Sequence, residues 1–207
     1  MKKYMNIKCM AVFSLLSFPI EASWAGASAV DIRVVGTLAA PGCFVVAPNN
    51  GVYDLGTLPV TSGKSTKIAL APLSQTWRIQ CEAETYLKLL ATDNRAVVGT
   101  SSEPASYGLL GRSGGEALGY YYVEIANATV NGKPARVLAP GGGDSARMRS
   151  GRPMGWWQGD VALHSGRLFS ADITVYPFLT AAGAAKSRAL EGETVDGSMT
   201  ISFEFGL

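Results

Sequence analysis

Three residues of the chain have the types and the order of a hydrolytic triad. The segment Gly111-Arg112-Ser113-Gly114-Gly115 has the G-x-S-x-G spacing of a nucleophile elbow, and Asp160 and His164 follow it in matching order. In that chemistry the serine oxygen attacks a carbonyl carbon while the histidine accepts its proton. The elbow needs a helix after the serine, whereas here a tyrosine-rich strand pattern begins at Gly119. We therefore expect a glycine-rich turn between strands and no enzyme.

The chain offers little with which to hold a metal, a phosphate or a nucleic acid. One histidine and 3 cysteines are too few for the usual multi-ligand zinc sites, and we expect His164 to lie in a solvated loop. The run Gly141-Gly142-Gly143 lacks the Lys-Ser/Thr that completes a phosphate-binding loop. The 18 basic and 16 acidic residues form no clustered basic patch. We expect no cofactor, no metal and no nucleic-acid partner.

Two adjacent tryptophans, Trp156 and Trp157, lie in a glycine-rich segment at about residues 139–168. We expect this segment to be a long loop or lobe inserted in the domain. Aromatic rings in such a loop are a candidate ligand surface, for example for a sugar. The other interpretation is an aromatic plug that covers one end of a β-domain.

The first 29 residues have the pattern of a secretory signal peptide. Three lysines precede a mostly apolar stretch at residues 10–20, and small residues follow. Pro19 and the basic start disfavour a buried strand or helix here. No apolar run reaches the roughly 20 residues that span a bilayer, so we expect export without a membrane span. Three cleavage points fit the pattern: after Ala25, after Ala27 or after Ala29.

Removing residues 1–29 changes both the charge and the cysteine content. The remainder has 15 basic and 15 acidic residues, so its net charge is near zero. Two cysteines remain, Cys43 and Cys81. In an oxidising compartment such a pair is expected to form a disulfide, and the alternative is two free buried thiols. Closing a loop of 38 residues stabilises the fold by about 4 kcal/mol on the chain-entropy account.

Alternation of apolar and polar residues with period two indicates an all-β domain. The pattern predicts strands at residues 30–34, 77–81, 87–91, 119–130 and 173–175, with a weaker candidate at 52–60. It is clearest at residues 195–207, where the odd positions from Met199 onward are apolar. No linker divides residues 30–207, so we expect a single β-sandwich domain.

Turn and breaker residues divide these strands. Asn131-Gly132 is a strong hairpin signal, and Glu82-Ala83-Glu84 is expected to separate two strands. Pro177 is expected to end its strand or to place it at an edge. Residues 181–190 are the one candidate for a short helix.

Several short segments carry a resemblance to a known group of proteins. They are Val34-Val35-Gly36-Thr37-Leu38 with Pro41 and Cys43, Tyr53-Asp54-Leu55-Gly56-Thr57-Leu58, Ile79-Gln80-Cys81, Leu89-Leu90-Ala91-Thr92-Asp93-Asn94-Arg95, Gly119-Tyr120-Tyr121, and Val195-Asp196-Gly197-Ser198-Met199-Thr200-Ile201. Together they resemble the pilin subunits of the chaperone–usher pathway. More closely, they are similar to the fimbrial-like family of exported proteins catalogued as a domain of unknown function. The resemblance covers about residues 30–207.

The resemblance implies an incomplete immunoglobulin-like β-sandwich that lacks its last strand. In that family a periplasmic pilus chaperone lends the missing strand, and a strand of another fimbrial subunit replaces it at the outer-membrane usher. The resemblance therefore implies a location first in the periplasm and then in a cell-surface fimbrium. It also implies a function in adhesion. The strand gripped by the chaperone would contain Met199, Ile201, Phe203 and Phe205, and the candidate donor strand contains Val30, Ile32 and Val34. The other interpretation of residues 199–205 is the core of a complete sandwich.

The chain departs from the pilin pattern in two places. Pilins usually have a penultimate aromatic residue, whereas Phe205 is followed by Gly206 and Leu207. Six residues separate Ala29 from Gly36, and ten separate Ala25 from Gly36, which is a short donor arm. The sequence is therefore compatible with a major, a minor, a terminal or a non-polymerising subunit. The alternative function is a stand-alone periplasmic carbohydrate- or ligand-binding module.

Overall fold

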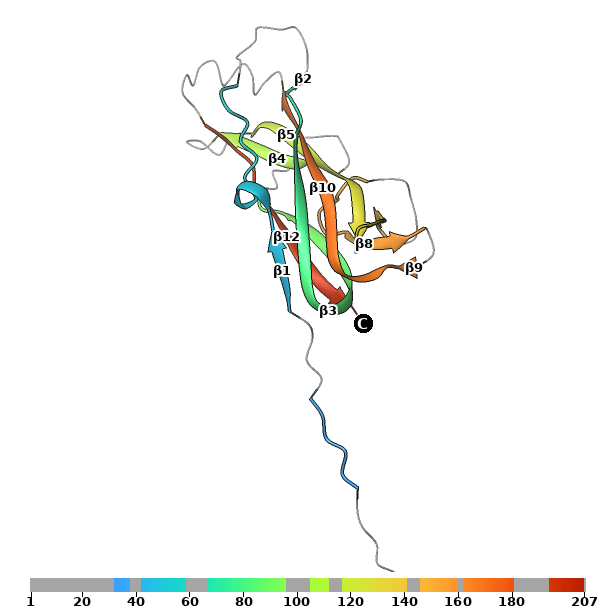
Figure 1. The fold of residues 1–207 in the computed structure, drawn as a ribbon. Helices are drawn as coiled ribbons and strands as arrows, with labels where there is room; N and C mark the ends of the chain where they lie inside the picture. Colours follow the sequence, from blue (N-terminus) through green and yellow to red (C-terminus); the bar gives the residue numbers. More distant parts are fainter. Residues whose placement is uncertain are drawn as a thin grey trace, which may run out of the picture. The chain divides into compact units, whose positions relative to one another are not determined.

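The computed structural model describes residues 32–37, 42–58, 67–95, 105–111, 117–140, 146–159, 162–180 and 194–206. The chain divides into two units, Met1–Leu38 and Ala39–Leu207. In the first unit, residues 32–37 form no regular secondary structure, and the side chains of Ile32 and Val34 are 89% and 90% exposed. Val30 lies outside the described residues. All the described strands belong to the second unit (Figure 1).

The described part of the second unit is almost entirely β-structure, and its strand pairings are antiparallel. The expectation of an all-β domain is confirmed. A single short 3-10 helix, η1 (Pro48–Gly51), accompanies the strands in the described ranges. The strands are β1 (Cys43–Val46), β2 (Lys67–Ala69), β3 (Leu73–Asp93), β4 (Tyr107–Gly111), β5 (Ala117–Val130), β6 (Lys133–Pro134), β7 (Arg136–Leu138), β8 (Pro153–Gln158), β9 (Ala162–Leu163), β10 (Ser165–Thr180), β11 (Val195–Asp196) and β12 (Met199–Gly206).

The long strand β3 connects two groups of strands. Its first half pairs with β1 and β10, and its second half pairs with β12 and β8 (Figure 1). The prediction that Glu82-Ala83-Glu84 separates two strands is wrong, because β3 continues through these residues, although its pairing with β10 shifts register between Gln80 and Thr85. Their exposed side chains mark the place where β3 leaves the first group of strands and joins the second. The polar run is therefore a junction within one strand and not a loop.

The core follows the period-two pattern along β3 and the middle of β5. In β3 the odd residues from Ile79 to Ala91 are buried, apart from Ala83, and the even residues are exposed or half-buried. In β5 Tyr121, Val123 and Ile125 are buried, and beyond Asn127, which has a positive φ, the buried residues are Ala128 and Val130. The buried cluster also includes residues from β8 and β10. Its members on these four strands include Ile79, Cys81, Leu87, Leu89, Ala91, Tyr121, Val123, Ile125, Met154, Trp156, Phe169, Ala171 and Ile173.

The predicted hairpin at Asn131-Gly132 is confirmed. β5 pairs with β6 across it, and Val130 lies opposite Lys133. Both turn residues have positive φ, 50° for Asn131 and 76° for Gly132. This is the backbone of a type I′ turn, which asparagine followed by glycine adopts most easily.

Pro177 neither ends its strand nor lies at an edge, which corrects the prediction. β10 continues to Thr180, and Pro177 lies opposite Tyr121 of β5. On its other side the partner of β10 changes from β3 at Val175 to β2 at Phe178. The carbonyl of Pro177 accepts a hydrogen bond from the N–H of Leu70 at 3.0 Å. Proline is tolerated because this gap between partners requires no N–H donor.

Three other segments also differ from the sequence predictions. Residues 52–58 form no strand, and residues 59–60 lie outside the described ranges, as do residues 181–190. The segment 139–168 is not one long loop, because β8, β9 and the start of β10 lie in it. The strand predicted at 195–207 is two strands, β11 and β12, interrupted at Gly197. A Cβ atom at Gly197 would lie 2.7 Å from the ring of Tyr121, so the chain passes too close to the core for a side chain.

Candidate functional site

One edge of β12 has no partner among the described strands. The N–H of Asn94 donates to the carbonyl of Ser198 at 3.0 Å, which fixes which residues of β12 face β3. Backbone polar groups alternate along a strand, so the even-numbered residues of β12 bond to β3. The odd-numbered residues direct their N–H and C=O groups to the other edge. These are the residues predicted as the chaperone-gripped strand: Met199, Ile201, Phe203 and Phe205.

One edge of β1 is free in the same sense. The N–H of Glu82 donates to the carbonyl of Gly42 at 2.9 Å, so Gly42 and the residues two and four places after it face β3. The N–H and C=O groups of Cys43 and Val45 therefore point away from β3. In the described part of the chain, β3 is the only strand that pairs with β1.

β1 and β12 lie along the same edge of β3. The backbone N–H of Glu82 bonds to Gly42, which precedes β1, and the backbone N–H of Asn94 bonds to Ser198, which precedes β12. Both donors are even-numbered residues, so their N–H groups point to the same edge of the strand. The odd-numbered Ala91 directs its carbonyl to the opposite edge, where it accepts from the N–H of Gly151 at 2.8 Å. The odd residues on both sides of the exposed Ala83, from Ile79 to Cys81 and from Thr85 to Ala91, are buried, so the two halves of β3 turn residues of the same parity inward. Two unpaired strand edges therefore border the same side of β3.

The side chains beside these two edges are apolar and incompletely buried. Met199, Ile201 and Phe203 pack against the core but remain half-buried, and Phe205 is 39% exposed. In β1 the run of three residues after Cys43 is exposed on both faces: Phe44 66%, Val45 42% and Val46 61%. An apolar strand with a free edge is a template for pairing with another chain. We call this set of β1 and β12 residues the open edge.

β1 belongs to the open edge although no functional role was expected for it from the sequence. The signal was available, because Phe44, Val45 and Val46 form an apolar run directly after a cysteine. The predicted disulfide is confirmed: Cys43 and Cys81 lie opposite each other in the β1–β3 register and are bonded. This bond ties the start of the short strand β1 to β3.

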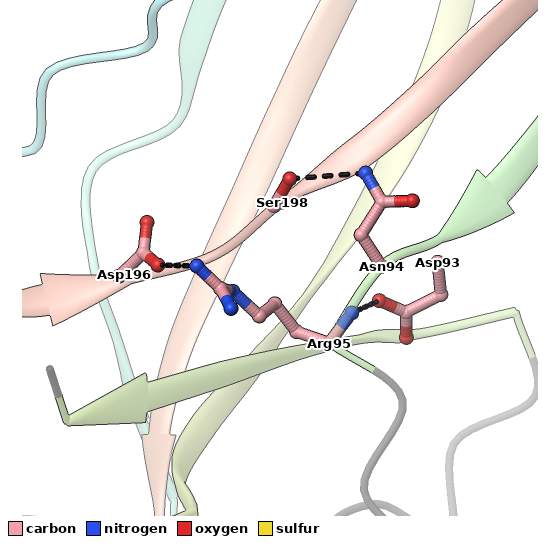
Figure 2. A network of polar contacts seen from close by, with 5 residues as sticks. All are labelled: Asp93, Asn94, Arg95, Asp196 and Ser198. Carbon is pink, nitrogen blue, oxygen red and sulfur yellow. Dashed lines mark hydrogen bonds and ion pairs between the residues drawn. The ribbon is translucent and has the colours of Figure 1, made fainter. Parts of the chain in front are cut away.

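A network of polar contacts fastens the start of β12 to the end of β3 (Figure 2). The side-chain Nδ2 of Asn94 donates to Ser198 Oγ and to Thr200 Oγ1, each at 3.0 Å. The guanidinium of Arg95 forms an ion pair with Asp196. The segment 91–95, which the sequence analysis singled out for its resemblance alone, thus fixes the position at which β12 begins.

Asp93 completes this network and affects two buried tyrosines. Its carboxylate accepts from the backbone N–H of Arg95 at 2.8 Å and of Gly108 at 3.3 Å. Burial raises the pKa of Tyr107 and of Tyr121 above the usual tyrosine range, and the negative charge of Asp93 raises both further. The two phenols therefore stay neutral at physiological pH. Their rings stack with centroids 5.3 Å apart, and both belong to the buried core cluster.

The two tryptophans do not form a joint ligand surface. Trp156 is 1% exposed and packs edge-on against Phe169, with ring centroids 5.6 Å apart. Its indole N–H donates to the carbonyl of Ser170 at 3.3 Å. Trp157 is half-buried, and its N–H donates to the carbonyl of Leu138 at 3.1 Å. The prediction of a ligand surface is wrong for Trp156, because alternation along β8 turns its ring into the core.

Only one member of the possible hydrolytic triad lies in the described residues. Ser113 and Asp160 fall outside them. His164 is half-buried between β9 and β10, and its backbone N–H donates to the carbonyl of Trp156 at 2.8 Å.

No group of three or more His, Cys, Asp or Glu side chains in the described ranges is arranged to hold a metal ion. No helix found there has the length and apolar character needed to cross a membrane.

No protein-family model matches the sequence, and no curated protein matches it.

Proposed function

We propose that this chain is a fimbrial or fimbrial-like structural subunit of a chaperone–usher pathway, completed by a strand that another protein donates. The observation that supports this function is the open edge. Two apolar strands, β1 and β12, have unpaired backbone groups on the same side of β3. A protein that functioned alone would be expected to cover or charge such edges.

In this proposal the β-domain is an immunoglobulin-like sandwich without its last strand. The strands form one connected antiparallel network, which in this proposal folds at β3 into two layers: β1, the first half of β3, β10, β5 and β4 in one, and β12, the second half of β3, β8 and β7 in the other. A strand added beside β12 would pair with its free edge and extend the second layer. The incomplete burial of Met199, Ile201 and Phe203 is what a missing strand leaves behind.

A donated strand gains affinity from two sources. Its backbone bonds to the free N–H and C=O groups of β12, and alternate side chains enter the core beside Ile201 and Phe203. Burying three or four large apolar side chains contributes roughly 5–10 kcal/mol before ordering costs. A periplasmic chaperone supplies the first strand, and a neighbouring fimbrial subunit replaces it at the outer-membrane usher. The disulfide and the signal-peptide pattern fit this exported route.

Stabilisation by an added strand tests the proposal. The purified chain is mixed with a synthetic peptide in which valine and isoleucine alternate with threonine, and the thermal midpoint is measured. At a peptide concentration of 100 times Kd, the fold is expected to gain about 2.7 kcal/mol. Ile201→Pro removes an outward N–H donor but no bond to β3, so we expect at least tenfold weaker peptide binding.

A neighbouring proline provides the matched control. Ser202→Pro removes an N–H that faces β3, so it is expected to lower the free energy of unfolding by about 1–3 kcal/mol even without peptide. The proposal fails if the parent midpoint does not respond to the peptide. It also fails if Ile201→Pro responds as strongly as the parent.

A further inference from the structure

The chain contains two asparagine–glycine pairs, Asn50-Gly51 and Asn131-Gly132. Such a pair can modify itself with water as the only other reactant. The backbone nitrogen of the glycine attacks the side-chain carbonyl carbon of the asparagine and loses its proton, while the bond to the side-chain nitrogen breaks and ammonia leaves. Water then opens the resulting five-membered imide to aspartate or isoaspartate. Glycine favours the attack because no side chain crowds its nitrogen.

Both pairs lie in exposed turns whose residues have positive φ, and these turns must open before the reaction can occur. Asn50 has φ 52° and ψ 32°. At this ψ the nitrogen of Gly51 and the Cβ of Asn50 lie on opposite sides of the bond between Cα and the carbonyl carbon. The nitrogen therefore points away from the carbon that it has to attack. The contacts that hold each turn closed decide which pair reacts.

The turn at Asn131 is held closed by its side chain and by its backbone. Its Oδ1 accepts from the backbone N–H groups of Arg167 and Leu168, each at 3.0 Å. Its own N–H donates to the carbonyl of Leu168 at 2.7 Å. The pairing of β5 with β6 closes the hairpin around the turn. Opening at Asn131 breaks all of these bonds.

Much less holds the turn at Asn50. The N–H of Val52 donates to the carbonyl of Asn49 at 3.0 Å, and Nδ2 of Asn49 donates to the carbonyl of Val52 at 3.1 Å. The side-chain amide of Asn50 itself forms no hydrogen bond within the part of the chain that the structure describes. Asn49 and Asn50 are also consecutive left-handed residues, with φ 48° and 52°, a conformation that is strained for residues with a side chain. Opening relieves this strain.

We infer that Asn50 is a site of spontaneous deamidation, and that the bonds to β10 protect Asn131 from the same reaction. The isoaspartate product adds one carbon to the backbone directly after β1. Gly51 lies close to the ring of Trp77, since a Cβ atom there would be 3.3 Å from it, and Gln75 Nε2 donates to the carbonyl of Val52 at 2.7 Å. A longer backbone cannot keep both contacts unchanged, so deamidation loosens the connection that follows β1.

Ageing of the purified chain in mildly alkaline buffer tests the inference. Proteolytic peptides are quantified by mass spectrometry, which detects the exchange of an NH group for an oxygen atom. Asn50 is expected to react at least about tenfold faster than Asn131, because reaction at Asn131 requires three additional hydrogen bonds to break. The same chain in urea is the matched control. Neither turn is formed there, so the two rates should become similar.

A second variant tests the structural consequence. Asn50→Gln keeps the amide but lengthens the side chain, so the five-membered ring cannot form. Ageing is expected to raise amide hydrogen exchange at Val46, the last residue of β1, several-fold in the parent and not in this variant.

Each outcome decides one part of the inference. Equal rates at Asn50 and Asn131 in the folded chain would overturn the protection of Asn131. An Asn50 that stays unmodified while the unfolded chain reacts would overturn the site. Equal exchange at Val46 in the aged parent and the aged variant would overturn the loosening of β1.

Discussion

Replacing Cys43 and Cys81 together by serine is expected to lower the free energy of unfolding by about 4 kcal/mol. The disulfide joins residues separated by 38 positions. On the chain-entropy account, removing it raises the entropy of the unfolded chain and so stabilises the unfolded state by this amount. Single domains are stable by only about 5–15 kcal/mol, so the variant is expected to be largely unfolded under mild denaturation. Urea denaturation followed by circular dichroism measures the change.

The same substitution is expected to affect the open edge before the rest of the fold. β1 has four residues, is exposed on both faces after Cys43 and bonds along one edge only. Without the covalent bond it is expected to detach and to weaken peptide binding. Dithiothreitol should reproduce the effect in the parent and do nothing to the serine variant. A difference in unfolding free energy below about 1 kcal/mol would contradict the role assigned to the disulfide.

Trp156→Ala is expected to destabilise the domain by about 3–5 kcal/mol. The side chain is fully buried, so truncation removes its packing on Phe169 and leaves a cavity in the core. It also leaves the carbonyl of Ser170 without the indole donor. The shift of the urea midpoint measures the effect.

The adjacent Trp157 is the matched control for this substitution. It is half-buried, so Trp157→Ala removes less packing. The free energy of unfolding should therefore fall clearly less in Trp157→Ala than in Trp156→Ala. Equal midpoints for Trp156→Ala and the parent would show that the ring is dispensable, against its assignment to the core.

Local patterns predicted those features that depend on one strand or one turn. Alternation identified the inward faces of β5 and β12, and Asn131-Gly132 identified its hairpin because the turn requires positive φ at both residues. The cysteine pair was predictable because two cysteines permit one pairing.

Features that depend on the partners of a strand could not be predicted in this way. The run Glu82-Ala83-Glu84 resembles a turn in sequence, and only the pairing with β10 and β12 shows that β3 continues through it. Pro177 resembles a strand end, and the change of partner from β3 to β2 explains why it is not one. Trp156 lies in a glycine-rich segment, so its place in β8 was hidden.

The candidate site was predicted in part for the same reason. Period two singled out Met199, Ile201, Phe203 and Phe205, because their side chains share a face. It could not show that their backbone groups point away from β3, since this depends on the register that the bond from Asn94 to Ser198 fixes. The part played by β1 was missed because four residues are too few to display a period.

Residue-resolved amide hydrogen exchange of β12, with and without the peptide, tests the open edge most directly. In the purified chain the N–H groups of Thr200, Ser202 and Glu204 are expected to exchange slowly because they face β3, and those of Ile201, Phe203 and Phe205 to exchange fast. Peptide binding should then protect the fast-exchanging set. Odd-numbered amides that are as protected as their neighbours in the chain alone, or that stay unprotected when the peptide is bound, would contradict a free edge that accepts a strand.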